Sequence, residues 1–388
     1  MMLDDLQLGY EPEPPQRKRS VVAFVVGLLL LVVLAFGVFL GYQGLVGAFR
    51  TPDYAGTGTA EKVEVEIKPG ATQVDIAKVL AEADVIKSPK AFVDAGVDND
   101  EALRIQPGFY RLPKRMSGDA AVLALLDPQN RIVRGVLIRE GLVTVEIYKL
   151  LAEELGRDVG EFEKAAQDPV KLGVPEWWFN RKDGTSTDKR SVEGFLFPAT
   201  YEFAPHTSAE QALSTMVRKF LTVTGGLDFA ERVQKDRNIS PYEALIGASI
   251  VESEVQTPAD MGKAARAVYN RVYTDRHDCR CLQLDAAINY YFKISGEKAK
   301  DPNEFRMSEI HNPDNPYNTH IRPGMPVSPI SNPGENALNA AMDTPVGDWL
   351  YWVTVDTKGT TLFADNYEGH LANIKLACKN GVLTGELC

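Results

Sequence analysis

The chain has 388 residues, 44% of them hydrophobic, which is enough for two or three domains with hydrophobic cores of their own. Its formal net charge is -11 and its pI is near 5.1. Because no basic stripe of the required size occurs in the sequence, these values argue against a nucleic-acid-binding protein.

An uncharged apolar stretch lies near the N-terminus, at residues 21–40. Its length matches what a helix needs to cross the hydrocarbon core of a bilayer. We therefore predict a single transmembrane helix over residues 21–43. A cleaved signal peptide is the alternative, but its apolar region should be shorter, and no cleavage site with small residues follows this one.

The positive charges around this stretch indicate its orientation. Three of them, Arg17–Arg19, directly precede it, whereas Arg50 is the first to follow it. Since positive residues stay on the cytoplasmic side, we expect residues 1–20 to be a disordered cytoplasmic tail. The polar, Gly- and Thr-rich linker at residues 44–61 and everything beyond it should then lie outside the cytoplasm, anchored to the cell membrane by a single pass.

The first folded part is expected over residues 62–135. Val63–Ile67 alternates apolar and polar residues as a strand does, Pro69–Gly70 favours a turn, and Thr72 can cap the helix that follows. Apolar patterning indicates three further elements: a helix at residues 90–95, a strand at 108–112 and a helix at 120–126. This order of strand, turn and helix resembles the small LysM-like module of wall-binding proteins.

A similar order begins again after this module. A strand is expected over Arg134–Ile138, a turn at Arg139–Gly141, and a helix over Thr144–Leu155 with its threonine as the cap. EGLVTVEIYKLL here stands where PGATQVDIAKVL stood before, so we consider an internal repeat. We expect the second domain, also of α+β class, to run over residues 136–388.

The stretch Ser240–Glu254 (SPYEALIGASIVESE) carries a strong helix-start signal. Ser240, Pro241 and Glu243 occupy the positions of an N-cap, a first helical residue and the reciprocating acid of a capping box. With the start fixed, helical periodicity places Glu252 at the end of a largely apolar stripe. A carboxyl group that burial keeps from ionising can serve as a general acid near neutral pH. The alternative is a solvated or satisfied helix acid, which describes most glutamates in helices.

A second helix start follows directly. Thr257, Pro258 and Asp260 repeat the pattern of cap, first-turn proline and acid. The inner stripe of this helix consists of four apolar residues, Met261, Ala264, Ala265 and Val268. The tight turn between the two helices should place Glu252 and Glu254 directly beside it.

Several sequence blocks surround these helices. EGFLFPATYEF (193–203) precedes them, and LQLD (282–285), NPYNT (315–319), PGMP (323–326) and PISNPG (329–334) follow in this order. Together with ASIVES, the blocks resemble the MltG (YceG-like) family of endolytic murein transglycosylases over about Val63–Lys375. The resemblance implies a YceG-like catalytic domain that cleaves peptidoglycan glycan strands, ends the elongation of nascent strands and works beside peptidoglycan synthases and the division or elongation machinery.

The resemblance also implies which residues form the site. Glu252 matches the catalytic acid/base of the family. The residues expected to bind substrate or to support the site are Glu254, Gln283, Asp285, Tyr201, Glu193, Tyr317, Asn318, Thr319 and Asn332. Three places depart from the family pattern: His320 stands where an aromatic residue is usual, Ala199 where an acid is favoured, and GMPV (324–327) where GLPP is usual. The substrate contacts around His320 and Ala199 are therefore open.

The chemistry that the resemblance implies needs one carboxylic acid. Cleavage of the β-1,4 bond between N-acetylmuramic acid and N-acetylglucosamine requires a proton on the leaving oxygen and support for an oxocarbenium-like transition state. If Glu252 gives that proton and then takes one from the muramic C6 hydroxyl, that oxygen closes on C1 and leaves a 1,6-anhydro end. No metal or cofactor is expected, and the pKa of Glu252 should be raised from about 4.3 toward neutrality.

Two other functions stay open at this point. Hydrolysis would need a base or nucleophile beside Glu252, and Glu254, Asp285 or Glu193 could serve. A non-catalytic wall-binding scaffold would rely on the LysM-like module alone. The S-x-x-K of Ser295–Lys298 lacks the companion motifs of penicillin-binding enzymes, so we interpret it as a solvated loop.

All four cysteines lie in the last third of the chain, which the expected topology places outside the cytoplasm, so disulfides are expected. Cys378 with Cys388 would close a short C-terminal loop and is the preferred pair. Cys279 with Cys281 would be strained, so crossed pairing between the two sets stays open. His277 with the latter two lacks the second ligand pair of a zinc site.

Overall fold

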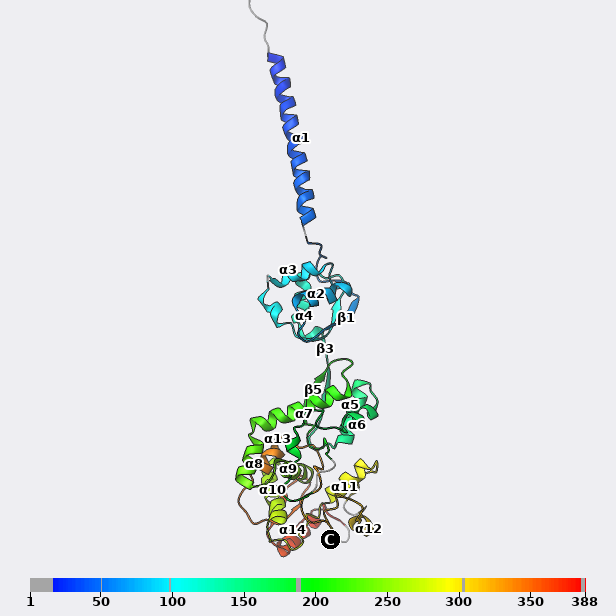
Figure 1. Ribbon diagram of the computed structural model, residues 1–388, viewed down its shortest axis with the longest axis vertical. Helices are drawn as coiled ribbons and strands as arrows, with labels where there is room; N and C mark the ends of the chain where they lie inside the picture. Colours follow the sequence, from blue (N-terminus) through cyan, green and yellow to red (C-terminus); the bar gives the residue numbers. More distant parts are fainter. Residues whose placement is uncertain (1–16, 50, 98, 186–189, 302–303, 385–387) are drawn as a thin grey trace, which may run out of the picture. The chain divides into compact units, whose positions relative to one another are not determined.

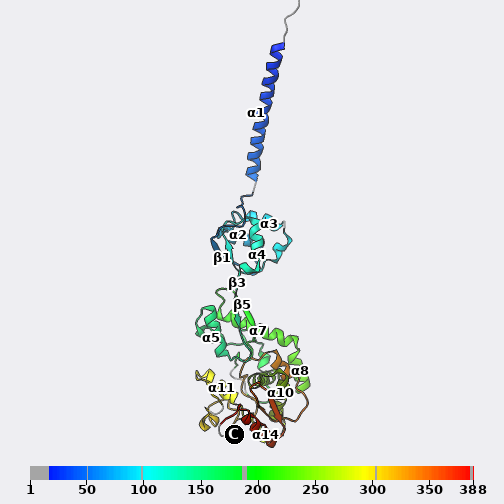
Figure 2. The same cartoon turned by 180° about the vertical axis from the view of Figure 1, so that it is seen from behind.

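The computed structural model describes residues 17–49, 51–97, 99–185, 190–301, 304–384 and 388, and within the first helix it describes the side chains of residues 24–40. Helices and short antiparallel strands give an α+β architecture (Figures 1 and 2). The chain divides into two compact units, Met1–Arg131 and Ile132–Cys388, and each is described by itself.

The first helix, α1, runs over Arg17–Phe49 and takes in the segment 21–43. Its described side chains are exposed. Within the described part of the chain, no helix is found that is both long and apolar enough to cross a membrane. The transmembrane helix stays a prediction, and most of the tail expected at residues 1–20 lies outside the described residues.

The rest of the first unit is a small antiparallel sheet packed against helices. β1 (Lys62–Ile67) pairs with β2 (Gly108–Pro113), with Val65 opposite Tyr110, and β2 also pairs with β3 (Arg131–Ile132). The helical elements are α2 (Gln73–Glu82), α3 (Pro89–Val97), the 3-10 turn η1 (Asp100–Arg104), α4 (Gly118–Leu126) and the 3-10 turn η2 (Pro128–Asn130). The strands and helices predicted in this region are confirmed, including the cap of α2 by Thr72.

The polar linker expected at residues 44–61 is packed on the first unit from residue 51 onward. The Ser88 hydroxyl donates to the Pro52 carbonyl oxygen at 2.7 Å. The Asp53 carboxylate accepts the N–H of Gly118 at 3.1 Å, where α4 begins. The prediction that folding starts only after this segment was wrong, because these distant polar partners fix a stretch whose composition is that of a flexible tether.

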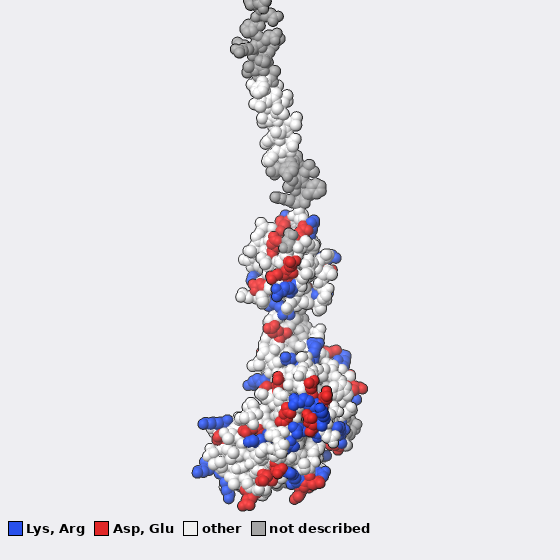
Figure 3. Space-filling model, turned by 90° about the vertical axis from the view of Figure 1, so that its left-hand side faces the viewer, with Lys and Arg blue, Asp and Glu red and all other residues white. Residues whose placement is uncertain are grey.

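The second unit contains two small antiparallel sheets and most of the helices. β4 (Arg134–Leu137) pairs with β5 (Thr200–Phe203), and β6 (Tyr351–Thr354) pairs with β7 (Thr361–Ala364). The helical elements are α5 (Thr144–Leu155), α6 (Val159–Ala165), η3 (Glu176–Phe179), α7 (Ala209–Gly226), α8 (Phe229–Arg237), α9 (Pro241–Glu254), α10 (Pro258–Tyr273), α11 (Asp285–Ile294), α12 (Met307–Ile310), α13 (Glu335–Met342) and α14 (Tyr367–Lys379). β6 is half-buried along its length. On the face shown in Figure 3, acidic and basic side chains are interspersed.

α9 lies among the other helices of the second unit and packs against α8, α10, α11 and α13 (Figure 1). It begins at Pro241 as predicted, with Ser240 and Glu243 forming the capping box. The prediction of a single apolar stripe was wrong, because every residue from Pro241 to Val251 is buried and the helix is covered on all faces. Only the last turn, from Glu252, reaches the surface, and the buried turns before it fix its position.

α10 begins at Pro258 as predicted, but its cap differs from the expected one. The Thr257 hydroxyl donates to the Gly359 carbonyl oxygen at 3.2 Å instead of accepting a bond from the helix. Asp260 accepts the N–H of Thr361 at 3.4 Å. Tertiary partners at the start of β7 thus replace the local capping box.

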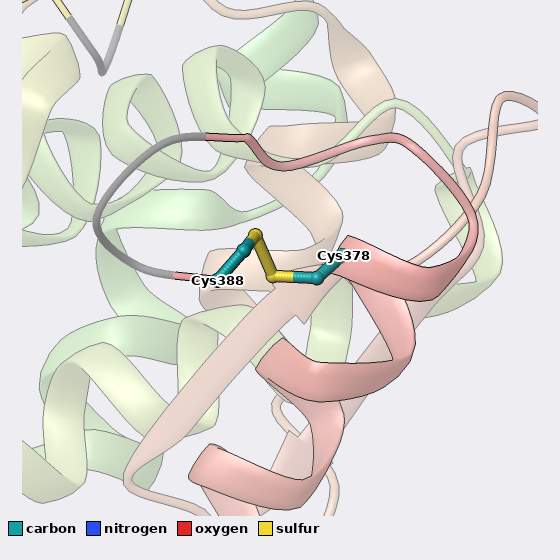
Figure 4. Close-up of a disulfide and its surroundings, with 2 residues drawn as sticks. All are labelled: Cys378 and Cys388. Atoms are coloured by element: carbon teal, nitrogen blue, oxygen red, sulfur yellow. A yellow bond between two sulfur atoms is a disulfide. The ribbon is translucent and has the colours of Figure 1, made fainter.

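The cysteines follow the preferred pairing in part. Cys378 and Cys388 form a disulfide that closes the loop after α14 (Figure 4). Cys279 and Cys281 are free, so the expectation that all four cysteines pair was wrong. Cys281 is buried, whereas Cys279 is exposed.

Candidate active site

Glu252 lies in the last turn of α9, where the helix emerges from the core. Its side chain is half-buried, and its Oε2 accepts a hydrogen bond from the backbone N–H of Gly334 at 3.0 Å. Gly334 directly precedes α13, so this N–H is one of the donors that a helix start leaves without an intrahelical partner. No other hydrogen bond reaches the Glu252 carboxyl group from the residues that the structure describes.

A second carboxyl group, that of Glu140, stands beside this contact. It fills the space in front of Gly334, since a Cβ at that glycine would come within 1.9 Å of Glu140 Oε1. Gly141 has a φ of +76°, and a Cβ there would lie 3.7 Å from Cγ of Glu252. The sequence predicts only a turn at Arg139–Gly141. The sequence feature that could have indicated Glu140 as a site residue is its position directly before the turn glycine Gly141, after the end of a predicted strand.

Three effects set the pKa of Glu252. Burial raises it above the ordinary glutamate value, the hydrogen bond from Gly334 lowers it, and the negative charge of Glu140 raises it. The net shift is upward. A raised pKa keeps more of this carboxyl group protonated near neutral pH, which a general acid requires.

Three neighbouring cavities run along the second unit past Glu252. The first has a volume of about 590 Å³, the second about 480 Å³ and the third about 460 Å³. The first and second cavities share Arg139, Glu140 and Glu252. The second and third share Ser253, Ala286 and Asn289. The three cavities are therefore adjacent to one another, and we call them together the groove; Glu252 lies between the first two.

Asn332 holds the walls of this groove together. Its Oδ1 accepts the N–H groups of Gly194 and Leu196 at 3.0 and 2.9 Å. Its Nδ2 donates to the Leu142 carbonyl oxygen at 3.0 Å and to Glu193 Oε1 at 2.7 Å. One fully buried side chain thus joins the EGFLFP loop to the turn at the groove wall.

Glu193 supports the same wall from inside the protein. It is fully buried and accepts the N–H of Thr144 at 3.1 Å and its hydroxyl at 2.9 Å. Thr144 was predicted to cap α5, but it is the first helical residue, and Glu193 takes the place of the cap. Burial raises the pKa of Glu193 to about 7, against the hydrogen bonds from Thr144, which lower it.

Residues 65–376 match the YceG-like family, which is most of the chain. The chain belongs to the YceG-like family. It is 29% identical over 322 residues to the endolytic murein transglycosylase of Bacillus subtilis (strain 168), covering 79% of this chain and 82% of that protein. It is 26% identical over 375 residues to the endolytic murein transglycosylase of Streptococcus pneumoniae (strain ATCC BAA-255 / R6), covering 91% of this chain and 65% of that longer protein.

A solved structure of another YceG-like protein shows the same fold. The 2.6 Å crystal structure of a YceG-like protein from Listeria monocytogenes superimposes with a TM-score of 0.52 at 25% sequence identity. The match covers 80% of this chain and 99% of that one. The predicted α+β class and YceG-like fold are confirmed.

In this YceG-like chain, Gln283 and Asp285 line the third cavity. Gln283 has a φ of +55°, which residues other than glycine seldom adopt, and its N–H donates to the Thr319 carbonyl oxygen at 3.0 Å. The Thr319 hydroxyl accepts the N–H of Leu284 at 2.9 Å, and His320 Nε2 lies 3.1 Å from Asp285 Oδ1. The NPYNT block and the residue after it therefore hold the LQLD block in place.

Three other predicted site residues lie away from the groove, and none of them lines the three cavities that the described residues enclose. The Tyr201 hydroxyl donates to a carbonyl oxygen of the EGFLFP loop at 2.5 Å. The Tyr317 hydroxyl lies 2.8 Å from Oγ of Ser328. The Asn318 amide donates to the carbonyl oxygen of Ile310, the last residue of α12, at 2.9 Å and to that of Asn312 at 3.1 Å. Their positions suit a supporting role.

Glu254 lies two residues beyond Glu252 and lines the third cavity. Its Oε2 accepts the indole N–H of Trp352 at 3.3 Å. Burial raises the pKa of Glu254 to about 7, with the Trp352 bond opposing and the charge of Asp285 adding to the shift. Because residues two apart on a helix point about 200° apart, the two acids face different parts of the groove.

Ala199 lies in the groove. It is the position where the sequence resemblance leads us to expect an acid instead. With Pro198, it lines the first cavity but not the second. The absence of an acid at this position leaves Glu140 and Glu252 as the carboxyl groups of that cavity.

The described residues offer no metal centre. No group of three or more His, Cys, Asp or Glu side chains among them stands close enough to hold a metal ion. Cys279 Sγ lies 3.6 Å from Nδ1 of His277, and the N–H of Cys281 donates to the same sulfur at 3.2 Å. These contacts occur within one turn.

Proposed function

We propose that this chain is an endolytic murein transglycosylase, which cleaves the bond between N-acetylmuramic acid and N-acetylglucosamine within peptidoglycan strands. The observation that carries the proposal is the position of Glu252, a half-buried acid with a raised pKa at the junction of two cavities. A glycan strand can place one sugar on each side of this acid. The relatives named for this activity support the proposal.

The reaction uses Glu252 first as an acid and then as a base. Its proton goes to the glycosidic oxygen as the bond from that oxygen to C1 of the muramic residue breaks. The carboxylate then takes the proton of the C6 hydroxyl, and that oxygen bonds to C1. The products are a new N-acetylglucosamine end and a 1,6-anhydro-muramic end, and Glu252 is protonated again.

The hydrogen bond from Gly334 suits both steps. It contacts Oε2 alone, so the other oxygen can exchange the proton with substrate. A backbone N–H stabilises the carboxylate that forms after the first step. The groove therefore supports both protonation states of one residue.

Hydrolysis is the second candidate function, and Glu140 is the observation that favours it. A carboxylate beside the acid can activate a water molecule. Of the residues suggested by sequence for this role, Glu193 is held by Thr144 and Asn332, whereas Glu254 lines the third cavity and not the first two. Glu140 lines both cavities that meet at Glu252.

The remaining expectations become part of the proposal. α1 is the single-pass anchor, with the N-terminus in the cytoplasm and the second unit outside it. Residues 62–135 form a LysM-like wall-binding module, which the order of strand, helices and antiparallel strand supports. Enzymes of peptidoglycan synthesis are the expected partners, because this activity would end the elongation of nascent strands.

Mass spectrometry of the products tests the proposal. Purified sacculi or nascent glycan are incubated with the full chain, with the Glu252→Gln protein as the blank and a muramidase digest as the reference. We expect fragments from within strands that end in 1,6-anhydro-muramic acid, lighter by one water than the muramidase products. Fragments with reducing ends that are absent with the Glu140→Gln protein would support hydrolysis. If no fragments form at all, the non-catalytic wall-binding scaffold is the function that remains.

A further inference from the structure

The third cavity of the groove has a composition that acid catalysis at Glu252 does not explain. It shares Ser253, Ala286 and Asn289 with the second cavity, and Glu252 does not line it. Charged and aromatic side chains dominate its lining, among them Glu254, Arg271, Asp285, Tyr351, Trp352 and His370. The chain thus gathers both signs of charge in a space of about 460 Å³ next to the candidate site.

Arg271 is the cation of this cavity, and one of its donors has no partner. The residue is 6% exposed. Its Nη1 donates to the Leu282 carbonyl oxygen at 2.5 Å, but its Nε is buried without any hydrogen bond. The guanidinium lies over the ring of Tyr351, 4.9 Å from the centroid, and over that of Trp352 at 5.6 Å. No carboxylate of the described residues lies within ion-pairing distance of it.

His370 brings a second unpartnered atom to the same place. It lies on α14, and its ring stacks on Tyr351 with the centroids 5.0 Å apart. Its Nδ1 is buried without a hydrogen bond. Arg271 and His370 both line this cavity, and each has a buried polar atom without a partner among the described residues. Buried polar groups of this kind are costly unless a ligand or water satisfies them.

The acidic side chains lie at the same cavity but belong to other elements. Glu254 accepts its bond from Trp352, and Asp285 lies 3.1 Å from Nε2 of His320. Gln283 adds an exposed amide. A ligand with only negative groups would meet repulsion from these acids, and one with only positive groups would meet repulsion from Arg271. The lining suits a ligand that carries both a carboxylate and an amino group.

We propose that the third cavity binds the peptide stem of a muramoyl unit in the strand, with a stem carboxylate on Arg271 and an amino group toward Glu254 and Asp285. This proposal rests on the proposed function, because it assumes a peptidoglycan strand in the groove. The stem is the part of that polymer that carries both charges, whereas the sugars carry neither. The enzyme therefore selects strands whose stems are intact.

A binding experiment separates this proposal from catalysis. The full-length chain with Glu252→Gln, which should not cut, is titrated with a glycan tetrasaccharide that carries complete stems and with the same tetrasaccharide after an amidase has removed them. We expect the stem-bearing ligand to bind at least about 10-fold more tightly, as one buried charge-assisted hydrogen bond provides. Adding Arg271→Met should bring the ratio of the two affinities close to one, and Arg271→Lys should keep part of it.

Two further variants make the result decisive. His370→Phe keeps the stacked ring but removes Nδ1, so it should lower the affinity ratio even if Arg271→Met does not fold. Arg232→Met removes an exposed arginine of α8, paired with Asp343, and should leave the ratio as it was. Equal affinity for both tetrasaccharides, or an unchanged ratio in both cavity variants, would overturn the proposal. Failure of the proposed function would appear separately, as intact strands after incubation with the unaltered chain.

Discussion

The two ends of α9 each carry a glutamate, and the structure surrounds them in opposite ways. At the start, Glu243 is fully buried and accepts bonds from the N–H of Ser240 at 2.8 Å, the N–H of Lys182 at 3.1 Å and the hydroxyl of Tyr273 at 3.0 Å. At the end, Glu252 is half-buried and accepts a single backbone bond at 3.0 Å. One end is closed by donors, and the other opens to a groove.

The difference separates a structural acid from a reactive one. A carboxylate whose oxygens all have donors loses those bonds when it moves or gains a proton, so it fixes the helix start. A carboxylate with an oxygen toward a groove can exchange a proton there while the fold stays intact. Glu243 holds α9 in place, and the position of Glu252 depends on that hold.

The largest effect is expected from Glu252→Gln. Glutamine keeps the size of the side chain and can still accept the N–H of Gly334, but it has no acidic proton to give. We expect strand cleavage to fall by roughly 100-fold or more, with an unchanged melting temperature. Chromatography of released fragments and thermal unfolding measure the two quantities. Full activity in this variant would refute the mechanism.

Glu243→Gln should have the reverse profile. Its amide nitrogen would either face the N–H groups of Ser240 and Lys182 or make the Tyr273 hydroxyl accept instead of donate, and in both cases charge-assisted bonds are lost in a buried place. We expect the free energy of unfolding to fall by about 3 kcal/mol, measured by denaturant titration. The activity of the folded fraction should persist. A loss of activity without a loss of stability would contradict the comparison.

Glu193 provides a pH test of the buried side of the groove. Its pKa is about 7 in the folded chain against an ordinary value of 4.5, so its stabilising contribution is fully present below pH 4.5 and is lost as the pH rises through about 7. We expect the unfolding free energy to decline over this window by about 3 kcal/mol. Glu193→Gln should flatten the decline, which denaturant titrations at several pH values would reveal. An unchanged slope would assign the decline to other groups.

The smallest effect is expected from Glu140→Gln. The charge of Glu140 raises the pKa of Glu252, so its removal should lower that pKa. A general acid loses activity as the pH rises through its pKa, and the alkaline limb of the cleavage profile should therefore move to lower pH by roughly half a unit. A profile of kcat against pH measures the shift. Movement to higher pH would show that Glu140 does not act through its charge.

The elements with local signals could be predicted from the sequence. The capping boxes at Thr72 and Ser240 fixed the starts of α2 and α9 to the residue. The strand over Arg134–Ile138 appeared as β4 within one residue. Such signals lie within a few residues of one another, so no knowledge of distant contacts is needed.

The burial of α9 could not be predicted, because distant partners make it possible. Ser249 is a polar residue within the predicted apolar stripe, on the same face as Leu245 and Ala248. Its hydroxyl donates to the Ile246 carbonyl oxygen at 2.7 Å and accepts the N–H of Ile330 at 3.0 Å. A serine satisfied in this way can be buried, and the amphipathic pattern then underestimates how much of the helix is covered.

Site residues that belong to a family sequence block could be predicted. Residues that join the site only because distant parts of the chain come close together could not. Glu252 stands in a block of its own, but Glu140 belongs to a turn with no motif. It joins the site because Gly334, far along the chain, has no side chain to exclude its carboxyl group. The roles of Asn332 and Glu193 as supports likewise emerge only when their partners are seen.

The free cysteines offer a way to label the protein close to the groove. Cys279 is exposed and lies shortly before Gln283, which lines the third cavity, while burial raises the pKa of Cys281 to about 12 and suppresses its thiolate. Cys378 and Cys388 are already bonded to each other. A maleimide dye should therefore attach at one position of the unaltered chain. Its emission would report strand occupancy in real time, without any engineered mutation.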